Sequence, residues 1–203
     1  MKYLKTYESI KSIDSICRKY DIRNYTINRD GSIDVRGDVD LSNKSLKKLP
    51  LRFNYVSGNF NCCVNNLITL KGSPREVGGI FYCHFNSLKS LEFGPERVGG
   101  SFFCESNQIS TLKYSPREVG GGFYFGTNPL PELMLQYIYI ATCRDQPLAH
   151  LNCSVFSSGA SVYFIKIIMS ESEDFSIWRR DGSLDELRFK YMMTILKEEG
   201  KIT

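Results

Sequence analysis

Three side chains that could do chemistry follow one another at equal intervals. Cys63, His84 and Glu105 are 21 residues apart, and a thiol, an imidazole and a carboxylate in that order could serve as nucleophile, base and orienting acid. If a repeat places them on neighbouring strands, their positions are about 4.8 Å apart. An open strand surface offers no evident oxyanion hole, however, and a simple surface pair of His84 and Glu105 accounts for the same residues. We therefore expect no enzymatic activity from this column.

A second series of cysteines has the same interval. Cys62, Cys83 and Cys104 are also 21 residues apart, whereas metal sites usually draw their ligands from short pairs, and even spacing gives a line rather than a tetrahedron. Disulfides between coils would need converging side chains and an oxidising compartment, and the sequence shows no secretion signal. The favoured interpretation is small core residues in a reducing compartment, with no cofactor and no metal. Cys63, next to the inward Cys62, is expected to face outward.

These residues belong to a repeat that occupies the middle of the chain. Seven columns recur with a period of 21 residues, and chance cannot hold so many in phase. The columns are Phe60, Phe81, Phe102 and Phe123; Asn65, Asn86, Asn107 and Asn128; Leu67, Leu88, Ile109 and Leu130; Leu70, Leu91, Leu112 and Leu133; Pro74, Pro95 and Pro116; Val77, Val98 and Val119; and the glycine pairs at 78–79, 99–100 and 120–121.

The repeating unit reads V-G-G-x-F-x-C-x-x-N-x-L-x-x-L-x-x-x-P-x-x. It resembles the leucine-rich repeat, whose L-x-x-L-x-L-x-x-N-x-L pattern it matches with Phe and Cys in two leucine slots. The paired glycines and the lead-in at 25–35 are similar to short-unit repeats in small proteins of large bacteriophages. The resemblance covers residues 22–133. It implies an α/β leucine-rich-repeat solenoid of about five coils with a parallel β-sheet.

Each column has an expected role in such a solenoid. Phe81 and Cys83 have strand periodicity and should face the core. The asparagines should turn inward and bond backbone groups of neighbouring coils. The paired glycines suit a tight corner that requires positive φ. The prolines stiffen a return segment, where charged pairs such as Arg75-Glu76 indicate a solvated convex face.

The solenoid, at residues 37–133, is expected to have a cap at each end. The N-terminal cap, residues 1–36, should contain a helix at 5–20 and a hairpin that turns at Arg29-Asp30-Gly31.

The C-terminal part, residues 134–203, is expected to be a mainly helical cap or effector region. Apart from a helix over 132–143 at its start, the patterns predict a helix at 162–169, where a strand is the alternative, and another after Ser183. Ser183 and Glu186 match a capping box, with Ser183 as the N-cap, and Gly200 should end this helix.

Composition excludes few classes of function. The 203 residues are 42% hydrophobic and 24% charged, as in ordinary soluble domains. Apolar runs fall short of about 18 residues, so we predict no membrane span. The net charge of +4 is too small to require nucleic acid. The expected location is the cytoplasm, and the resemblance to phage repeats implies the cytoplasm of an infected host.

The outward-facing strand positions contain the candidate binding site. Alternation places three aromatic rings in one outward column, and exposed rings of this kind are typical of interfaces. The predicted protein-binding stripe consists of Asn61, Ile80, Tyr82, His84, Phe103, Glu105 and Tyr124. Two alternatives are that a tail covers the rings or that ring packing merely stabilises the sheet. The oligomeric state is left open.

Two functions follow from this stripe. The first is non-enzymatic binding of a protein, which the phage resemblance narrows to a host partner: an accessory protein that inhibits a host defence or a host enzyme. The alternative is a single-stranded nucleic-acid binder that stacks bases on the rings. Neighbouring acids such as Asp40 make nucleic acid the less favoured partner.

Overall fold

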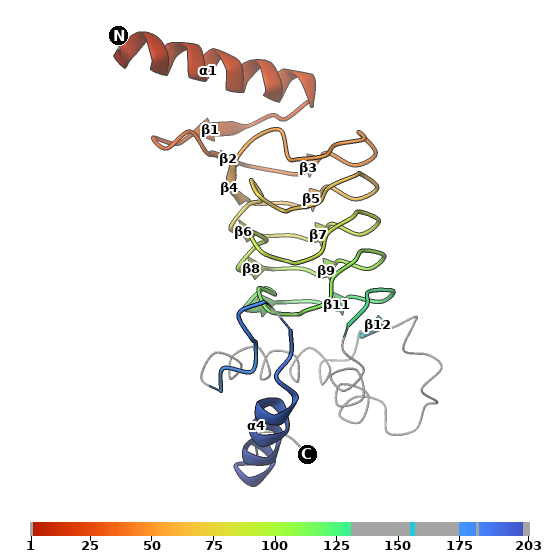
Figure 1. Cartoon of the computed structure of the whole chain (residues 1–203). Coiled ribbons are helices and arrows are strands. Elements are labelled where there is room, and N and C mark those ends of the chain that lie inside the picture. Colours follow the sequence, from red (N-terminus) through yellow and green to blue (C-terminus); the bar gives the residue numbers. More distant parts are fainter. Residues whose placement is uncertain (1, 131–154, 157–174, 182, 201–203) are drawn as a thin grey trace.

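The computed structural model describes residues 2–130, 155–156, 175–181 and 183–200 and shows a solenoid. The structure has two six-stranded sheets, and each successive coil adds one short strand to each of them. The strands stack as rungs along one axis (Figure 1). Within the repeat, neighbouring rungs are parallel and 21 residues apart, so that Phe81 lies opposite Phe102 and Tyr82 opposite Phe103. The prediction of an α/β solenoid with parallel strands is confirmed.

The two sheets lie side by side around the coil. Sheet A contains, in spatial order, β1 (Tyr25–Ile27), β2 (Ile33–Val35), β4 (Phe53–Val56), β6 (Glu76–Val77), β8 (Arg97–Val98) and β10 (Glu118–Val119). Sheet B contains β3 (Val39–Asp40), β5 (Phe60–Asn61), β7 (Phe81–Tyr82), β9 (Phe102–Phe103), β11 (Phe123–Tyr124) and β12 (Val155–Phe156). The pairs β1–β2 and β11–β12 are antiparallel and close one end of each sheet.

Sheet A corrects one expectation about the repeat. Arg75-Glu76 was assigned to a return segment for which no strand was predicted, but Glu76 begins strand β6. The strand forms because Val77 is buried while the residue before it points to solvent. Charges of opposite sign face each other across coils: Arg75 Nε lies 3.0 Å from Glu96 Oε1, and Arg97 pairs with Glu76. The solvated character of the segment was predicted correctly, but its structure was not.

The core is a stack of identical residues along the axis. Phe60, Phe81, Phe102 and Phe123 are almost fully buried, with consecutive ring centroids 5.5, 5.3 and 5.2 Å apart. Cys62, Cys83 and Cys104 form a parallel column of free thiols with no exposed surface. Burial raises the pKa of all three thiols. They are core residues, as the favoured interpretation of the sequence held.

The asparagine column joins the coils as predicted. In Asn107, Nδ2 donates to the carbonyls of Cys83 and Cys104, and Oδ1 accepts from the Leu88 amide at 3.0 Å. Asn65, Asn86 and Asn128 make the corresponding bonds in their own coils. One side chain therefore satisfies backbone groups of two coils in a turn that is largely shielded from water.

The paired glycines are required for a reason other than the predicted one. None of Gly78, Gly99 and Gly120 has positive φ. A Cβ at these three positions would instead lie 2.3, 2.2 and 2.1 Å from a backbone oxygen of the preceding coil. The corner needs glycine because consecutive coils touch there, backbone against backbone.

The N-terminal cap was predicted correctly. Helix α1 (Lys2–Lys19) precedes the β1–β2 hairpin, whose turn contains Gly31 at φ 80°. Ile13 and Cys17 on the helix are buried in the same hydrophobic core as the first coil. The helix and hairpin lie across the first coil (Figure 1).

The C-terminal part is described for a strand, a turn and a helix. Helix α4 (Glu186–Glu198) ends before Gly200, which has φ 68° and caps it as predicted. Its N-cap is not Ser183 but Asp185, whose Oδ1 accepts from the Arg188 amide at 3.2 Å. Asp is as favourable an N-cap as Ser, and Asp185 directly precedes the first residue of the helix, so its carboxylate can reach the Arg188 amide. The predicted helices at 132–143 and 162–169 lie outside the described residues.

Within the described residues, neither helix α1 nor helix α4 has an apolar stretch long enough to cross a membrane.

Candidate functional site

The outward face of sheet B carries the predicted site residues in three columns. The corner column consists of Asp38, Asn59, Ile80, Ser101 and Gly122. The central column consists of Asp40, Asn61, Tyr82, Phe103 and Tyr124. The loop-side column consists of Ser42, Cys63, His84, Glu105 and Gly126. Ladder pairing keeps each column in line because every rung repeats the same register.

The three rings of the central column stack on one another. The centroids of Tyr82 and Phe103 are 5.1 Å apart with an interplanar angle of 16°, and those of Phe103 and Tyr124 are 4.2 Å apart at 3°. All three side chains are partly buried. Because nearly parallel rings one rung apart cover each other's faces, the stack presents mainly ring edges to solvent.

His84 connects this stack to a further exposed ring. Its imidazole centroid lies 5.9 Å from Tyr82 and 6.2 Å from Phe103, both edge to face. On the other side it lies 5.5 Å from Phe85, whose side chain is 59% exposed. We call the five residues Tyr82, His84, Phe85, Phe103 and Tyr124 the aromatic patch.

Phe85 belongs to a row of residues with left-handed backbone. The row comprises Asn43, Val64, Phe85, Ser106 and Thr127, with φ of 53°, 52°, 52°, 54° and 54°. Asn adopts this conformation readily, but for a bulky or β-branched residue it is strained. Val64 and Phe85 are nevertheless exposed, so burial does not offset the strain. Val64 and Phe85 combine backbone strain with exposed apolar side chains, and Phe85 is part of the aromatic patch. This combination favours a binding role for the row.

We expect Val64→Asn to raise the free energy of unfolding by about 1 kcal/mol, because Asn relieves the left-handed strain of a β-branched residue. Chemical denaturation would measure the change. Ile68→Asn is the matched control: Ile68 is also an exposed β-branched residue but does not have positive φ. Equal effects of the two substitutions would show that Val64 is not strained.

His84 and Glu105 each have a buried polar atom that lacks a partner. Within the described residues, neither His84 Nδ1 nor Glu105 Oε2 has a hydrogen-bond partner, although both atoms are shielded from solvent. Burial lowers the pKa of His84 and raises that of Glu105. No hydrogen bond or ion pair joins the two side chains in the described part of the chain. The geometry therefore lacks the base–orienter contact that a catalytic triad needs.

Cys63 does not lie on the surface, contrary to the sequence-based expectation. Only 8% of the residue is exposed, although alternation places it on the outward face. Burial, and then the negative charge of Asp40, raises the pKa of the thiol. An activated nucleophile needs the opposite shift.

We expect iodoacetamide to alkylate Cys63 more slowly than a free thiol at pH 7.5, with a rate midpoint above the reference pKa of about 8.5. A raised pKa leaves the thiol protonated and unreactive until higher pH. Cys63→Ala gives the background from the other cysteines. A midpoint well below the reference value would contradict this and restore the nucleophile hypothesis.

The remaining predicted residues have local roles. Asn61 Oδ1 accepts from the Cys63 amide at 3.1 Å, which fixes the turn after β5. Ile80 occupies a column in which Asn59 and Ser101 accept from the amide of the next coil, at 2.7 and 3.0 Å. Ring contacts join four of the seven predicted residues, namely Tyr82, His84, Phe103 and Tyr124. Sequence reasoning missed Val64 and Phe85, for which the only signal is an apolar residue in a row that otherwise holds Asn, Ser and Thr.

No group of three or more His, Cys, Asp or Glu side chains in the described segments is arranged to hold a metal ion. Comparisons with protein-family models, with curated proteins and with solved structures found no match. The geometry of the outward face is therefore the basis for the functional argument.

Proposed function

We propose that this chain is a non-enzymatic protein-binding module that docks a protein partner on the outward face of sheet B. The observation that carries the proposal is the aromatic patch, in which stacked rings continue through His84 to the exposed Phe85. Aromatic residues supply large contact area at low cost in conformational entropy and dominate interface energetics. The strain at Phe85 supports the same conclusion, because a smaller polar residue would fit the backbone better.

The resemblance to phage repeats extends this proposal to the identity of the partner. It favours a host protein, such as a defence factor or an enzyme, that is blocked when the module binds. Fold alone does not define function, so this extension depends on capture of the partner.

Single-stranded nucleic acid is less well supported as a ligand. Base stacking needs free ring faces, but Phe103 is covered by Tyr82 on one side and Tyr124 on the other. Phosphate binding needs basic side chains. None of the fifteen outward positions of sheet B is Lys or Arg.

Phe85→Ser tests the proposal better than a substitution of Phe103. Phe103 stacks on two rings, so its removal would lower stability as well as binding. Phe85 is exposed, and Ser already occupies the equivalent position as Ser106. We expect Phe85→Ser to leave thermal stability unchanged or raise it, and to weaken partner binding at least about tenfold, as for an interface hot spot.

The measurement is an affinity pulldown from bacterial lysate, followed by titration of the captured protein. Phe93→Ser is the matched control, because Phe93 is also exposed, at 54%, with φ of 66°, but is not part of the aromatic patch. A protein held by the unmodified chain and by Phe93→Ser, but lost by Phe85→Ser and by the Tyr82/Phe103 double alanine variant, supports the proposal. A protein that both patch variants retain contradicts it.

A further inference from the structure

We propose that the partner lays an acidic, extended segment along the loops that follow the strands of sheet B, where its carboxylates meet lysines and its apolar side chains meet exposed apolar residues. This inference rests on the proposed function and specifies the charge of the partner. The loops comprise residues 43–48, 64–69, 85–90 and 106–111, and together we call them the loop ridge.

The loop ridge is stacked in the same way as the sheet beside it. The Asn66 amide donates to the carbonyl of Leu46 in the preceding coil, and the Ser87 amide donates to that of Leu67, both at 2.9 Å. Equivalent residues of neighbouring loops therefore lie one rung apart, about 4.8 Å. Side chains on the ridge form columns along the solenoid axis, as they do on the sheet.

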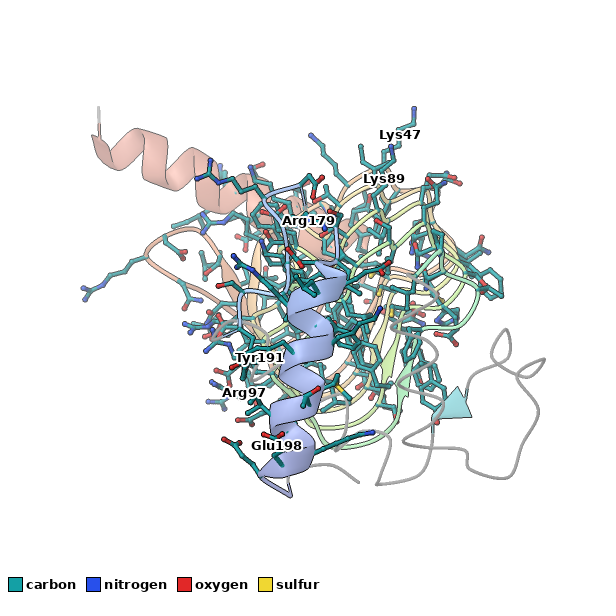
Figure 2. All side chains as sticks on the ribbon, turned by 60° about the horizontal axis from the view of Figure 1, so that its bottom comes forward. Lys47, Lys89, Arg97, Arg179, Tyr191 and Glu198 are labelled. Atoms are coloured by element: carbon teal, nitrogen blue, oxygen red, sulfur yellow. The ribbon has the colours of Figure 1, made fainter. Side chains whose placement is uncertain are left out.

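One column of the ridge alternates charged and apolar side chains. Lys47, Ile68 and Lys89 are 21 residues apart and all are exposed, Ile68 at 68%. Figure 2 shows Lys47 and Lys89 close together at one edge of the solenoid, well away from Arg97 on sheet A. The column therefore presents two cations on either side of an aliphatic side chain.

The charge of the ridge is not balanced by nearby acids of the same loops. These loops contain Lys44, Lys47, Lys48 and Lys89 and no Asp or Glu. On sheet A, by contrast, arginine and glutamate pair across coils, as in Arg75–Glu96. No ion pair joins a ridge lysine to another described residue. A surface of one sign favours a partner surface of the opposite sign.

Exposed apolar side chains connect the ridge to the aromatic patch. Phe85 belongs to both, and Val64 and Ile68 lie on the loop of the preceding coil with 47% and 68% of their surface exposed. A protein that docks on the aromatic patch is therefore next to the ridge lysines. Single-stranded nucleic acid fits the ridge less well, because base stacking needs aromatic faces and Phe85 is the one aromatic residue in these loops.

The spacing of the column predicts the pattern of the partner's segment. Lys47 and Lys89 are two rungs apart, about 10 Å, and a lysine head on its flexible stem can shift by several Å. An extended chain advances about 3.3 Å per residue and turns every second side chain to the same face. A sequence acid-x-apolar-x-acid therefore brings both carboxylates to the lysines and the apolar side chain to Ile68.

The test uses two capped pentapeptides, Glu-Ser-Leu-Ser-Glu and Gln-Ser-Leu-Ser-Gln, which differ in the charge of two side chains. Each is titrated into the full chain at pH 7 in low salt and followed by amide chemical shifts. We expect the acidic peptide to shift the signals of Lys47, Ile68, Phe85 and Lys89. It should bind about fivefold more tightly than the neutral peptide, because exposed ion pairs each contribute modestly. About 0.5 M salt should remove this preference.

Three variants assign the preference to the ridge. Lys47→Gln/Lys89→Gln should reduce it to less than about twofold. Lys190→Gln/Lys197→Gln, which removes the same charge from exposed positions of helix α4, should retain it. Ile68→Ser should weaken both peptides alike, at least about twofold, because it removes only the apolar contact.

The outcomes separate this inference from the proposed function. Equal binding of both peptides, an acidic preference that survives Lys47→Gln/Lys89→Gln, or full binding by Ile68→Ser overturns the inference and leaves protein docking intact. Absence of ridge shifts with the acidic peptide also overturns it. If oligo-thymidine or phosphatidylglycerol vesicles then produce those shifts, the ridge binds nucleic acid or a lipid surface instead. The proposed function is judged independently, by whether Phe85→Ser loses the captured protein.

Discussion

Asn65→Ala is expected to lower the free energy of unfolding by about 4 kcal/mol, because each buried group left without a partner costs about 1–3 kcal/mol. Asn65 Oδ1 accepts from the amides of Lys44 and Leu46 at 3.0 and 2.9 Å. Its Nδ2 lies 2.8–3.1 Å from the carbonyl oxygens of Leu41, Cys62 and Cys63. Alanine replaces none of these bonds, and the side chain is only 9% exposed, so water cannot reach the site easily. A loss of this size is a large part of the stability of a typical domain.

The next residue provides the control for this prediction. Asn66 is exposed, and Asn66→Ala should change stability by less than about 0.5 kcal/mol. Asn65→Asp separates hydrogen bonding from size, because aspartate has the shape of asparagine but cannot donate to the three carbonyls when ionised. Urea denaturation of the three variants would measure the effects. A mild effect of Asn65→Asp together with a large effect of Asn65→Ala would show that the column fills space rather than bonding the coils.

Most of the fold could be predicted because the same residue types recur at the same positions of every repeat. Phe81 alone is compatible with many structures, but the same residue every 21 positions, in phase with Asn86 and Leu88, specifies a stack of coils. The inward direction of the phenylalanines and the bonding of the asparagines both follow from that periodicity. The strand at Glu76–Val77 was missed because it has only two residues, within three that separate a proline from two glycines, and this is too few to show alternation.

The candidate site was only partly predictable, for a related reason. Alternation along a strand places Tyr82 and Phe103 on the outward face, and they are found there. It does not extend past the strand ends, where the chain turns through a left-handed residue. Val64 and Phe85 lie at this turn, and periodicity assigned no role to them. Periodicity did assign Cys63 to the outward surface, and that assignment was wrong. The burial of His84 Nδ1 and Glu105 Oε2 without hydrogen-bond partners depends on three-dimensional packing, which a pattern of residue types does not specify.

Gly99→Ala is the second large expected effect, a loss of about 3 kcal/mol in the free energy of unfolding. The added Cβ would lie 2.2 Å from the backbone oxygen of Gly78, a contact that real Cβ atoms essentially never show. The coils are held together on each side of this point, since Gly99 N donates to Val77 O and Gly100 N to Gly79 O, both at 2.8 Å. Relief of the clash therefore requires these bonds to lengthen, because a backbone oxygen, unlike a side chain, cannot rotate away.

Gly31 provides the contrast that tests this explanation. It has φ of +80° and nothing within 4 Å of an added Cβ, so Gly31→Ala should cost only about 1 kcal/mol of left-handed strain and Gly31→Asn less. At Gly99 the order should differ: asparagine tolerates positive φ but has a Cβ, so Gly99→Asn should be at least as destabilising as Gly99→Ala. Thermal denaturation of the four variants decides between the two explanations of the paired glycines. If Gly99→Asn is better tolerated than Gly99→Ala, the corner requires an unusual φ after all, and the close approach of the coils is not what selects glycine there.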